Sequence, residues 1–270
     1  MKILIISDLH ANPVGVRAIW EKEKDVDAVY AAGDYSDYGP DPSGAIGWIR
    51  DHGVRAVYGN HDQRVLKTLR EGQYDAVADG SLCWVHRNCQ LITPEEAGFL
   101  ENLPRSISFE ADGIAYLMQH QYGPRYEIIE SRFHFDKYWA ENYTGPARPG
   151  QKRRMIFGHT HRQMMVAFGE DALWFNPGST SYRRPDEPSK DAFYAVVEDG
   201  EISFRHVPYE KAALNAEVER LKPRLRWDEY HVAHYFFGVP ESDGPDDAWV
   251  EMVKAHFSAE NHKPLEEDLK

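Results

Sequence analysis

The first sixty residues alternate between short apolar runs and helix-like segments, and this alternation constrains the fold more than any other feature of the chain. Apolar runs at Lys2–Ile6, Ala28–Ala32 and Val54–Tyr58 have the length of buried strands. Helix-like segments at Pro13–Lys22 and Pro42–Asp51 separate them. A strand–helix–strand–helix–strand order predicts a parallel sheet with right-handed crossovers.

Polar residues follow each of these three strands. The strand ends read Ser7-Asp8-Leu9-His10, Gly33-Asp34 and Gly59-Asn60-His61-Asp62. In open α/β sheets, ligands bind outside the carboxyl ends of the strands. We therefore expect a binding site at this edge of the sheet, with Asp8 and His10 within it.

The chain changes character after residue 104. The stretch from Asp62 to Leu103 reads as mainly helical and closes with Pro104. Seven strand-like segments follow, at Ser106–Glu110, Ile114–Met118, Arg154–Phe157, Met164–Phe168, Ala172–Phe175, Ala192–Val197 and Ile202–Val207. Hairpin signals at Ala111-Asp112-Gly113 and Asp199-Gly200 join neighbours among them. These seven strands predict a second sheet packed on the first, and hence a layered α/β sandwich.

Two segments lie outside this strand pattern. The insertion at 121–153 holds seven aromatic residues and several arginines, which fits either a helical cap over the site or a peripheral helix packed by its aromatic side chains. After Val207, the spacing of Leu214, Val218 and Leu221 predicts an amphipathic helix. The last thirty residues are acidic, and we expect their end to be partly flexible.

Composition narrows the possible functions. The formal net charge of −13 argues against stable nucleic-acid binding and against binding to anionic membranes, because both need Lys/Arg-rich surfaces. The two cysteines, Cys83 and Cys89, are too few for a zinc site with His86, and we expect them to be reduced. No apolar stretch reaches the length of a signal-peptide core or a transmembrane span, so a cytoplasmic location is expected.

Histidines complete the pattern at the strand ends. His120 follows the strand at Ile114–Met118, and His159 and His161 follow the strand at Arg154–Phe157. The set at one edge is then Asp8, His10, Asp34, Asn60, His61, His120, His159 and His161. Mixed Asp, His and Asn ligation suits two ions of Mn, Fe, Zn, Ni or Co better than Ca or Mg. Two such ions with two carboxylates and one hydroxide keep about one positive charge, which would attract a phosphate ester.

These residues carry a resemblance to a known family. The segments SDLH, GDYSDYGPDP, GNHD, MQHQ and FGHTH resemble the five blocks of the calcineurin-like metallophosphoesterase superfamily, and WFNPGSTSYRR resembles a block of its small bacterial and archaeal YfcE-type branch. The resemblance runs from Met1 to about Pro208. It implies a four-layer α/β/β/α sandwich of two mixed sheets flanked by helices, formed by residues 1–208, with 209–270 as a helical extension.

The family pattern implies a role for each residue. Asp8, His10, Asp34 and His161 would hold the first metal, with Asp34 bridging, and Asn60, His120 and His159 would complete the second. His61 would be the general acid for the leaving oxygen, with Asp37 as its anionic partner.

The chain departs from the protein-phosphatase branch at one informative position. That branch has an arginine where this chain has Tyr38, which makes a phosphoprotein phosphatase a weaker prediction. Arg64, Arg183 or Arg184 could bind the substrate phosphate instead. The His120 block also lacks the usual following glycine.

The resemblance and the residues together predict a dinuclear metal-dependent phosphoesterase, with Mn as the favoured metal. We expect a phosphodiesterase that hydrolyses a small-molecule or nucleotide phosphate ester by in-line attack of a metal-bridging hydroxide. A nucleotide pyrophosphatase or a phosphoprotein phosphatase is the alternative. A binding scaffold that keeps the fold without turnover is a further alternative from another class of protein.

Overall fold

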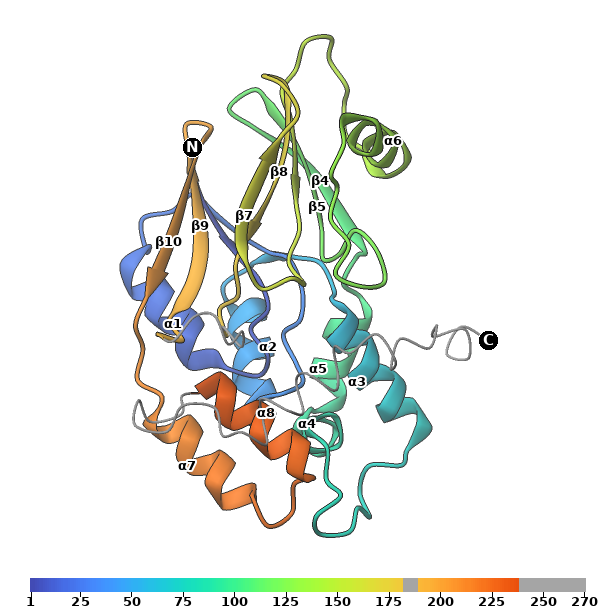
Figure 1. The fold of residues 1–270 in the computed structure, drawn as a ribbon, viewed down its shortest axis with the longest axis vertical. Helices are drawn as coiled ribbons and strands as arrows, with labels where there is room; N and C mark the ends of the chain where they lie inside the picture. Colours follow the sequence, from blue (N-terminus) through green and yellow to red (C-terminus); the bar gives the residue numbers. More distant parts are fainter. Residues whose placement is uncertain (182–188, 238–270) are drawn as a thin grey trace. The chain divides into compact units, whose positions relative to one another are not determined.

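Two five-stranded sheets pack face to face in the computed structural model, which describes residues 1–181 and 189–237 (Figure 1). In the first sheet β1 (Lys2–Ile6), β2 (Ala28–Ala31) and β3 (Arg55–Ala56) run parallel, as predicted. Strands β9 (Ala192–Glu198) and β10 (Glu201–Val207) complete it, giving the order β10-β9-β1-β2-β3.

The second sheet has the order β4-β5-β6-β8-β7. Its strands are β4 (Ser106–Ala111), β5 (Ile114–Gln119), β6 (Arg153–Ile156), β7 (Gln163–Ala167) and β8 (Ala172–Pro177). The two outer strands run antiparallel to their neighbours, whereas β5, β6 and β8 run parallel. Both sheets are therefore mixed.

The prediction that all seven later strands form the second sheet is wrong for two of them. After β8 the chain returns to the first sheet, where the N–H of Thr180 donates to the carbonyl of Ser7 and that of Ser181 to the carbonyl of Asp8. Strand β9 then runs antiparallel to β1, and the predicted hairpin at Asp199-Gly200 adds β10. The open edge of β1 offers unpaired backbone groups, which β9 satisfies.

Eight helices accompany the sheets in the described ranges. They are α1 (Pro13–Lys22), α2 (Pro42–Asp51), α3 (Asn60–Glu71), α4 (Trp84–Leu91), α5 (Pro94–Glu101), α6 (Arg132–Asn142), α7 (Ala212–Leu221) and α8 (Trp227–Phe237). Local sequence explains where several begin. Asn12 Oδ1 accepts hydrogen bonds from the N–H groups of Val14 and Gly15, and Thr93 with Glu96 forms a capping box.

Alternation along β1 shows how the layers arise. Leu4 and Ile6 belong to the apolar cluster shared with α1 to α5, α7 and α8, whereas Ile3 and Ile5 face the second sheet. Side chains of a strand point alternately to its two faces, so a strand buried on both faces reads as a continuous apolar run. The four-layer α/β/β/α sandwich predicted from the family resemblance is confirmed.

Helix α6 forms the fourth layer alone, beside the second sheet and away from the other helices (Figure 1). Its Phe135, Tyr138 and Trp139 pack against strand residues such as Leu117 and Trp174. Ahead of it, residues 125 and 126 approach the strand-end loops. These three aromatic side chains of the 121–153 insertion thus pack a peripheral helix, while the first part of the insertion reaches His159 of the candidate site.

The region after residue 208 continues the helical layer. Leu214, Val218 and Leu221 of α7 are buried, as the predicted apolar stripe requires. The two cysteines are free and buried. Within the described part of the chain, no helix is long and apolar enough to span a membrane. The division into 1–208 and 209–270 stays a prediction.

Candidate metal centre

The loops after the strands adopt an unusual backbone conformation at the predicted ligands. Asp8, His10, Asp34, His159 and His161 have positive φ angles of 54°, 48°, 58°, 67° and 59°. Non-glycine residues rarely adopt this left-handed region, and such strain concentrates at functional sites. Glycine at position 59 is required nearby, because a Cβ there would overlap the carboxylate of Asp34. The fold thus holds these loops against a local conformational cost.

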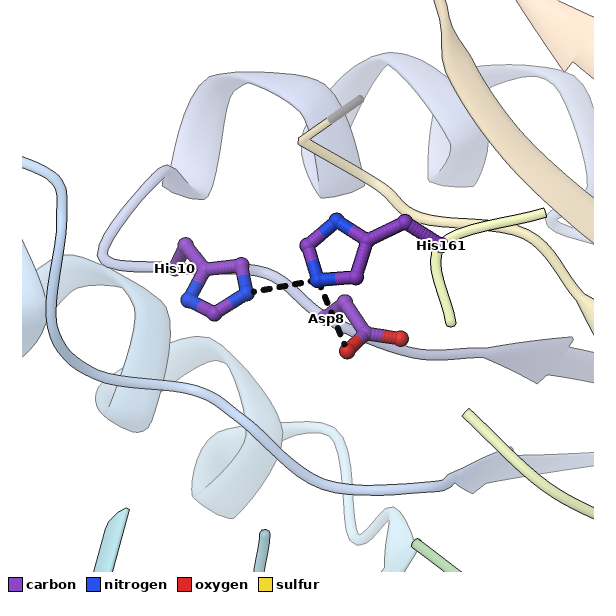
Figure 2. A group of neighbouring side chains, drawn as sticks. All are labelled: Asp8, His10 and His161. Carbon is purple, nitrogen blue, oxygen red and sulfur yellow. Dashed lines mark hydrogen bonds and ion pairs between the residues drawn. The ribbon is translucent and has the colours of Figure 1, made fainter. Parts of the chain in front are cut away.

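A first group of side chains comes from two loops that lie far apart in the sequence (Figure 2). His161 Nε2 lies 3.1 Å from His10 Nε2 and 3.3 Å from Asp8 Oδ1. All three residues are buried. Asp8 and His10 come from the loop after β1, and His161 comes from the loop between β6 and β7. Three potential donor atoms therefore converge within the 4.8 Å that one metal ion can span.

A second group lies beside it. One atom each from Asp34, His120 and His159 again fall within 4.8 Å of one another. The Asn60 Oδ1 atom lies 2.9 Å from His120 Nε2 and 3.0 Å from His159 Nδ1. The other ring nitrogen of His120, Nδ1, lies 2.6 Å from the Ala32 carbonyl oxygen, which orients the ring. The structure brings all seven predicted ligands into these two groups.

One carboxylate oxygen stands between the groups. Asp34 Oδ2 lies 3.1 Å from His120 Nε2 and 3.9 Å from His10 Nε2. It is buried, and its close contacts among the described residues are with these two imidazoles. A buried carboxylate costs free energy unless cations balance its charge. Imidazole nitrogens and carboxylate oxygens at these separations fit divalent metal ions.

The pKa values of the site residues depend on their burial and on the oppositely charged groups beside them. Burial opposes ionisation of Asp8, but the neighbouring His161 outweighs it and lowers the pKa of Asp8 to about 2. Burial lowers the pKa of His120, yet the adjacent Asp34 carboxylate raises it to about 9. Burial dominates at His159 and lowers its pKa to about 4. The carboxylates are therefore ionised near neutral pH and available as ligands.

His61 and Asp37 form a pair next to these groups. The Nδ1 atom of His61 lies 2.9 Å from Asp37 Oδ2, and a guanidinium nitrogen of Arg64 lies 3.3 Å from the same oxygen. Asp37 is buried, and its backbone N–H donates to Asn88 Oδ1 at 2.8 Å. Burial opposes ionisation of Asp37, but its contact with His61 lowers its pKa.

A buried carboxylate that the sequence analysis left without a role organises these loops. Asp62 accepts hydrogen bonds from the backbone N–H groups of Asp34, Tyr35, Ser36 and Gly59 at 2.9 to 3.1 Å. It thereby ties the loop after β2 to the start of α3. Burial and the neighbouring Asp34 raise the pKa of Asp62 to about 6. Its place in the GNHD segment is the signal that could have found it.

A second residue that the sequence analysis missed covers the first group. The Phe236 ring of α8 is fully buried, with its centroid 5.5 Å from that of His10 and 5.6 Å from that of Tyr38. It lies 6.5 Å from the His161 ring. No local pattern marks Phe236, because it meets His10 across 226 positions of sequence.

Of the three arginines predicted to bind substrate, one lies in the described part of the structure. Arg64 lies beside the His61–Asp37 pair and is partly exposed, so its contact with a substrate stays a prediction. Arg183 and Arg184 lie outside the described residues.

Comparisons with known proteins bear on the family and the fold of the chain. A family model described as the calcineurin-like phosphoesterase superfamily domain matches residues 1–199. An uncharacterized protein of Methanocaldococcus jannaschii is 28% identical over 233 residues, which cover 83% of this chain and 93% of the relative.

Two solved structures share the fold. A metallophosphoesterase from Sphaerobacter thermophilus has a TM-score of 0.65 at 21% identity, covering 87% of this chain and 99% of its own. A hypothetical protein from Pyrococcus horikoshii has a TM-score of 0.63 at 15% identity, covering 88% and 99%.

Proposed function

Because the chain belongs to the calcineurin-like phosphoesterase superfamily, we propose that it is a dinuclear metal-dependent phosphodiesterase. The observation that carries the proposal is the position of the buried Asp34 Oδ2 atom, which lies between an imidazole of each side-chain group, 3.1 Å from His120 Nε2 and 3.9 Å from His10 Nε2. A single carboxylate shared in this way suits a pair of metal ions.

The residues divide between two ions as follows. Asp8, His10 and His161 would hold the first, and Asn60, His120 and His159 would hold the second, with Asp34 shared. Imidazole and carboxylate donors favour Mn, Fe, Zn, Ni or Co, and we propose Mn. When bound, such ions supply a nucleophile at neutral pH and neutralise charge on the phosphate.

His61 would donate a proton to the leaving oxygen. Its Nδ1 faces Asp37 Oδ2 at 2.9 Å, so the carboxylate stabilises the protonated imidazole, and Nε2 is the nitrogen that would face the substrate. Asp37 acts through His61 as a positioning residue. A proton on the leaving oxygen prevents the formation of an unstable alkoxide. Departure of the leaving group limits the hydrolysis of esters with poor leaving groups, so this proton speeds their hydrolysis.

Two features favour a diester over a phosphoprotein. Tyr38 occupies the position where the protein-phosphatase branch has its phosphate-binding arginine, and its ring packs against His61 with centroids 4.7 Å apart. Arg64 is the cation closest to this pair in the described ranges, and Asp37 already neutralises part of its charge. A dianionic monoester needs more positive charge than a monoanionic diester.

Hydrolysis of two model esters tests the proposal. We would compare bis-p-nitrophenyl phosphate with p-nitrophenyl phosphate in Mn²⁺ and after chelation. Mn²⁺-dependent turnover with the diester preferred is the expected result. Preference for the monoester would assign a phosphatase. Two bound metals without turnover of either ester would support a non-catalytic scaffold.

A further inference from the structure

The two sides of the proposed metal centre differ in exposure. The first group is closed, since Asp8 and His10 are fully buried and the Phe236 ring packs against His10. The second group is open, because Asn60 is exposed and His159 is partly exposed. A substrate would therefore reach the centre from the side of Asn60, and its larger substituent would extend in that direction.

A cavity of about 260 Å³ lies on that open side. Its lining includes Tyr58, Asn60, Gln63, Arg105, Gln119 and His120. Two of these, Asn60 and His120, are proposed ligands of the second metal, so the cavity adjoins the position of the scissile phosphate. The volume is slightly below the range of roughly 300–1,000 Å³ for pockets that hold drug-sized ligands. It suits one nucleotide unit rather than a longer chain.

One lining side chain has an unmet hydrogen-bonding need. Gln119, the last residue of β5, is 4% exposed, and its Oε1 accepts no hydrogen bond from the described residues. A buried amide oxygen without a donor costs about 1–3 kcal/mol. Because Gln119 also lines the cavity, a bound ligand with an N–H or O–H group would supply the missing donor once the amide turns toward the cavity, whereas an apolar ligand would not.

Arg105 adds a positive charge to the same cavity. Arg105 is exposed, and its guanidinium group forms no ion pair with another described residue. In a chain with a net charge of −13, an arginine beside a cavity that adjoins the metal centre is well placed for an anion. Guanidinium groups bind phosphate through paired hydrogen bonds.

We propose that this cavity binds a nucleotidyl group of the substrate, with Arg105 contacting its further phosphate and Gln119 accepting a hydrogen bond from it. The proposal rests on the proposed phosphodiesterase function and names its substrate class. Small nucleotide diesters that carry a terminal phosphate are then the preferred substrates.

The dinucleotides pApA and ApA test it, because they differ only in the 5′-phosphate. We expect kcat/KM in Mn²⁺ to be about tenfold higher for pApA, the factor that about 1.4 kcal/mol of binding free energy supplies. Arg105→Ala should reduce this ratio to about one, and Arg105→Lys should restore part of it, since lysine keeps the charge but not the paired geometry.

Arg17→Ala is the matched control, because Arg17 is an exposed arginine on α1 and its loss changes the net charge equally. This variant should keep the wild-type ratio. Equal rates for pApA and ApA in the wild type, or a ratio that Arg105→Ala leaves intact, would overturn the proposal. Turnover of bis-p-nitrophenyl phosphate separates that outcome from failure of the proposed function, in which no diester is hydrolysed.

Gln119→Met tests the hydrogen bond separately. Methionine has nearly the same length but its sulfur is a much weaker acceptor than an amide oxygen, and bis-p-nitrophenyl phosphate has no donor to offer. The ratio of kcat/KM for ApA to that for bis-p-nitrophenyl phosphate should therefore fall several-fold in the variant. An unchanged ratio would show that Gln119 does not accept a hydrogen bond from the substrate. Thermal unfolding of each variant checks that the fold is retained.

Discussion

The imidazole Nδ1 of His61 lies 2.9 Å from Oδ2 of the buried Asp37 carboxylate. This contact fixes the ring orientation and places a negative charge where it stabilises a protonated imidazole. A carboxylate, a histidine and an adjoining pair of candidate metal-ligand groups form an arrangement suited to acid-assisted hydrolysis.

His61→Ala should lower kcat for bis-p-nitrophenyl phosphate about 10²- to 10⁴-fold while both metals stay bound. The side chain of His61 is outside both candidate ligand groups, so the variant loses the proposed proton donor without losing a candidate ligand. Metal content by mass spectrometry and steady-state kinetics measure the two effects. His134→Ala on the outer helix α6 is the control, because His134 is exposed and should leave both unchanged. Loss of metal from the His61 variant would contradict the general-acid role.

Asp37→Asn should lower kcat about 10- to 100-fold and shift the pH dependence. The contact with His61 lowers the pKa of Asp37 against the effect of burial, so Asp37 is ionised throughout the neutral range. The neutral amide no longer stabilises the protonated imidazole, which then loses its proton at a lower pH. The alkaline limb of the kcat/KM profile should consequently move to lower pH. A profile that keeps its shape would show that Asp37 has no influence on the acid.

Asp34→Asn should reduce the bound metal from about two ions per chain to one or none. The neutral amide removes the negative charge that stands between the two groups, 3.1 Å from His120 Nε2 and 3.9 Å from His10 Nε2. Metal analysis after dialysis against Mn²⁺ gives the stoichiometry. Retention of two ions with wild-type affinity would argue against a shared carboxylate.

Much of this architecture could be predicted from local sequence. The apolar run at Lys2–Ile6 and the helix at Pro13–Lys22 match β1 and α1 at both ends, because burial on both faces and a strong N-cap leave little freedom. Polar residues that follow parallel strands of one sheet meet at the same edge of that sheet. Sequence alone could therefore bring Asp8, after β1, together with Asp34, after β2, whereas His161 follows a strand of the other sheet.

Contacts between segments that lie far apart in the sequence could not be predicted in this way. The β-strand pattern at Ala192–Glu198 contains no sign of which sheet it joins, since an open edge of either sheet would accept it. Phe236 reads as one more apolar residue of a helix until the fold places it against His10. Gln119 is similarly unremarkable as the end of a strand, and only its burial reveals an unmet acceptor.

Glu23→Gln should make stability less dependent on pH in the acid range. Glu23 is buried at the end of α1, where burial raises its pKa but contacts with Arg205 at 2.7 Å, Lys2 at 3.1 Å and Tyr194 at 3.0 Å outweigh this and lower it. The resulting stabilisation is present above the ordinary pKa of 4.5 and is lost as the pH falls through the lower folded value.

The variant should therefore be less stable than the wild type by about 1–3 kcal/mol at pH 7, and the difference should shrink below pH 4.5. Urea unfolding at a series of pH values measures it. Glu21→Gln provides a control on the same helix, because its carboxylate is 67% exposed and its ion pair within the described part of the chain is with Lys24. A difference that stays constant down to pH 3 would assign the loss to packing rather than to charge.

Phe236→Ala should speed the removal of metal by a chelator. The ring covers the first group, with its centroid 5.5 Å from that of His10, and its truncation would admit water and chelator to a site that is otherwise closed. We expect the rate of metal loss to EDTA to rise, along with a loss of about 3–5 kcal/mol in stability. Phe237→Ala separates the two effects. Phe237 is equally buried in the same helix, but its described ring contact is with Phe236 and not with a ligand. Equal acceleration in both variants would attribute metal loss to general destabilisation and not to an opened cover.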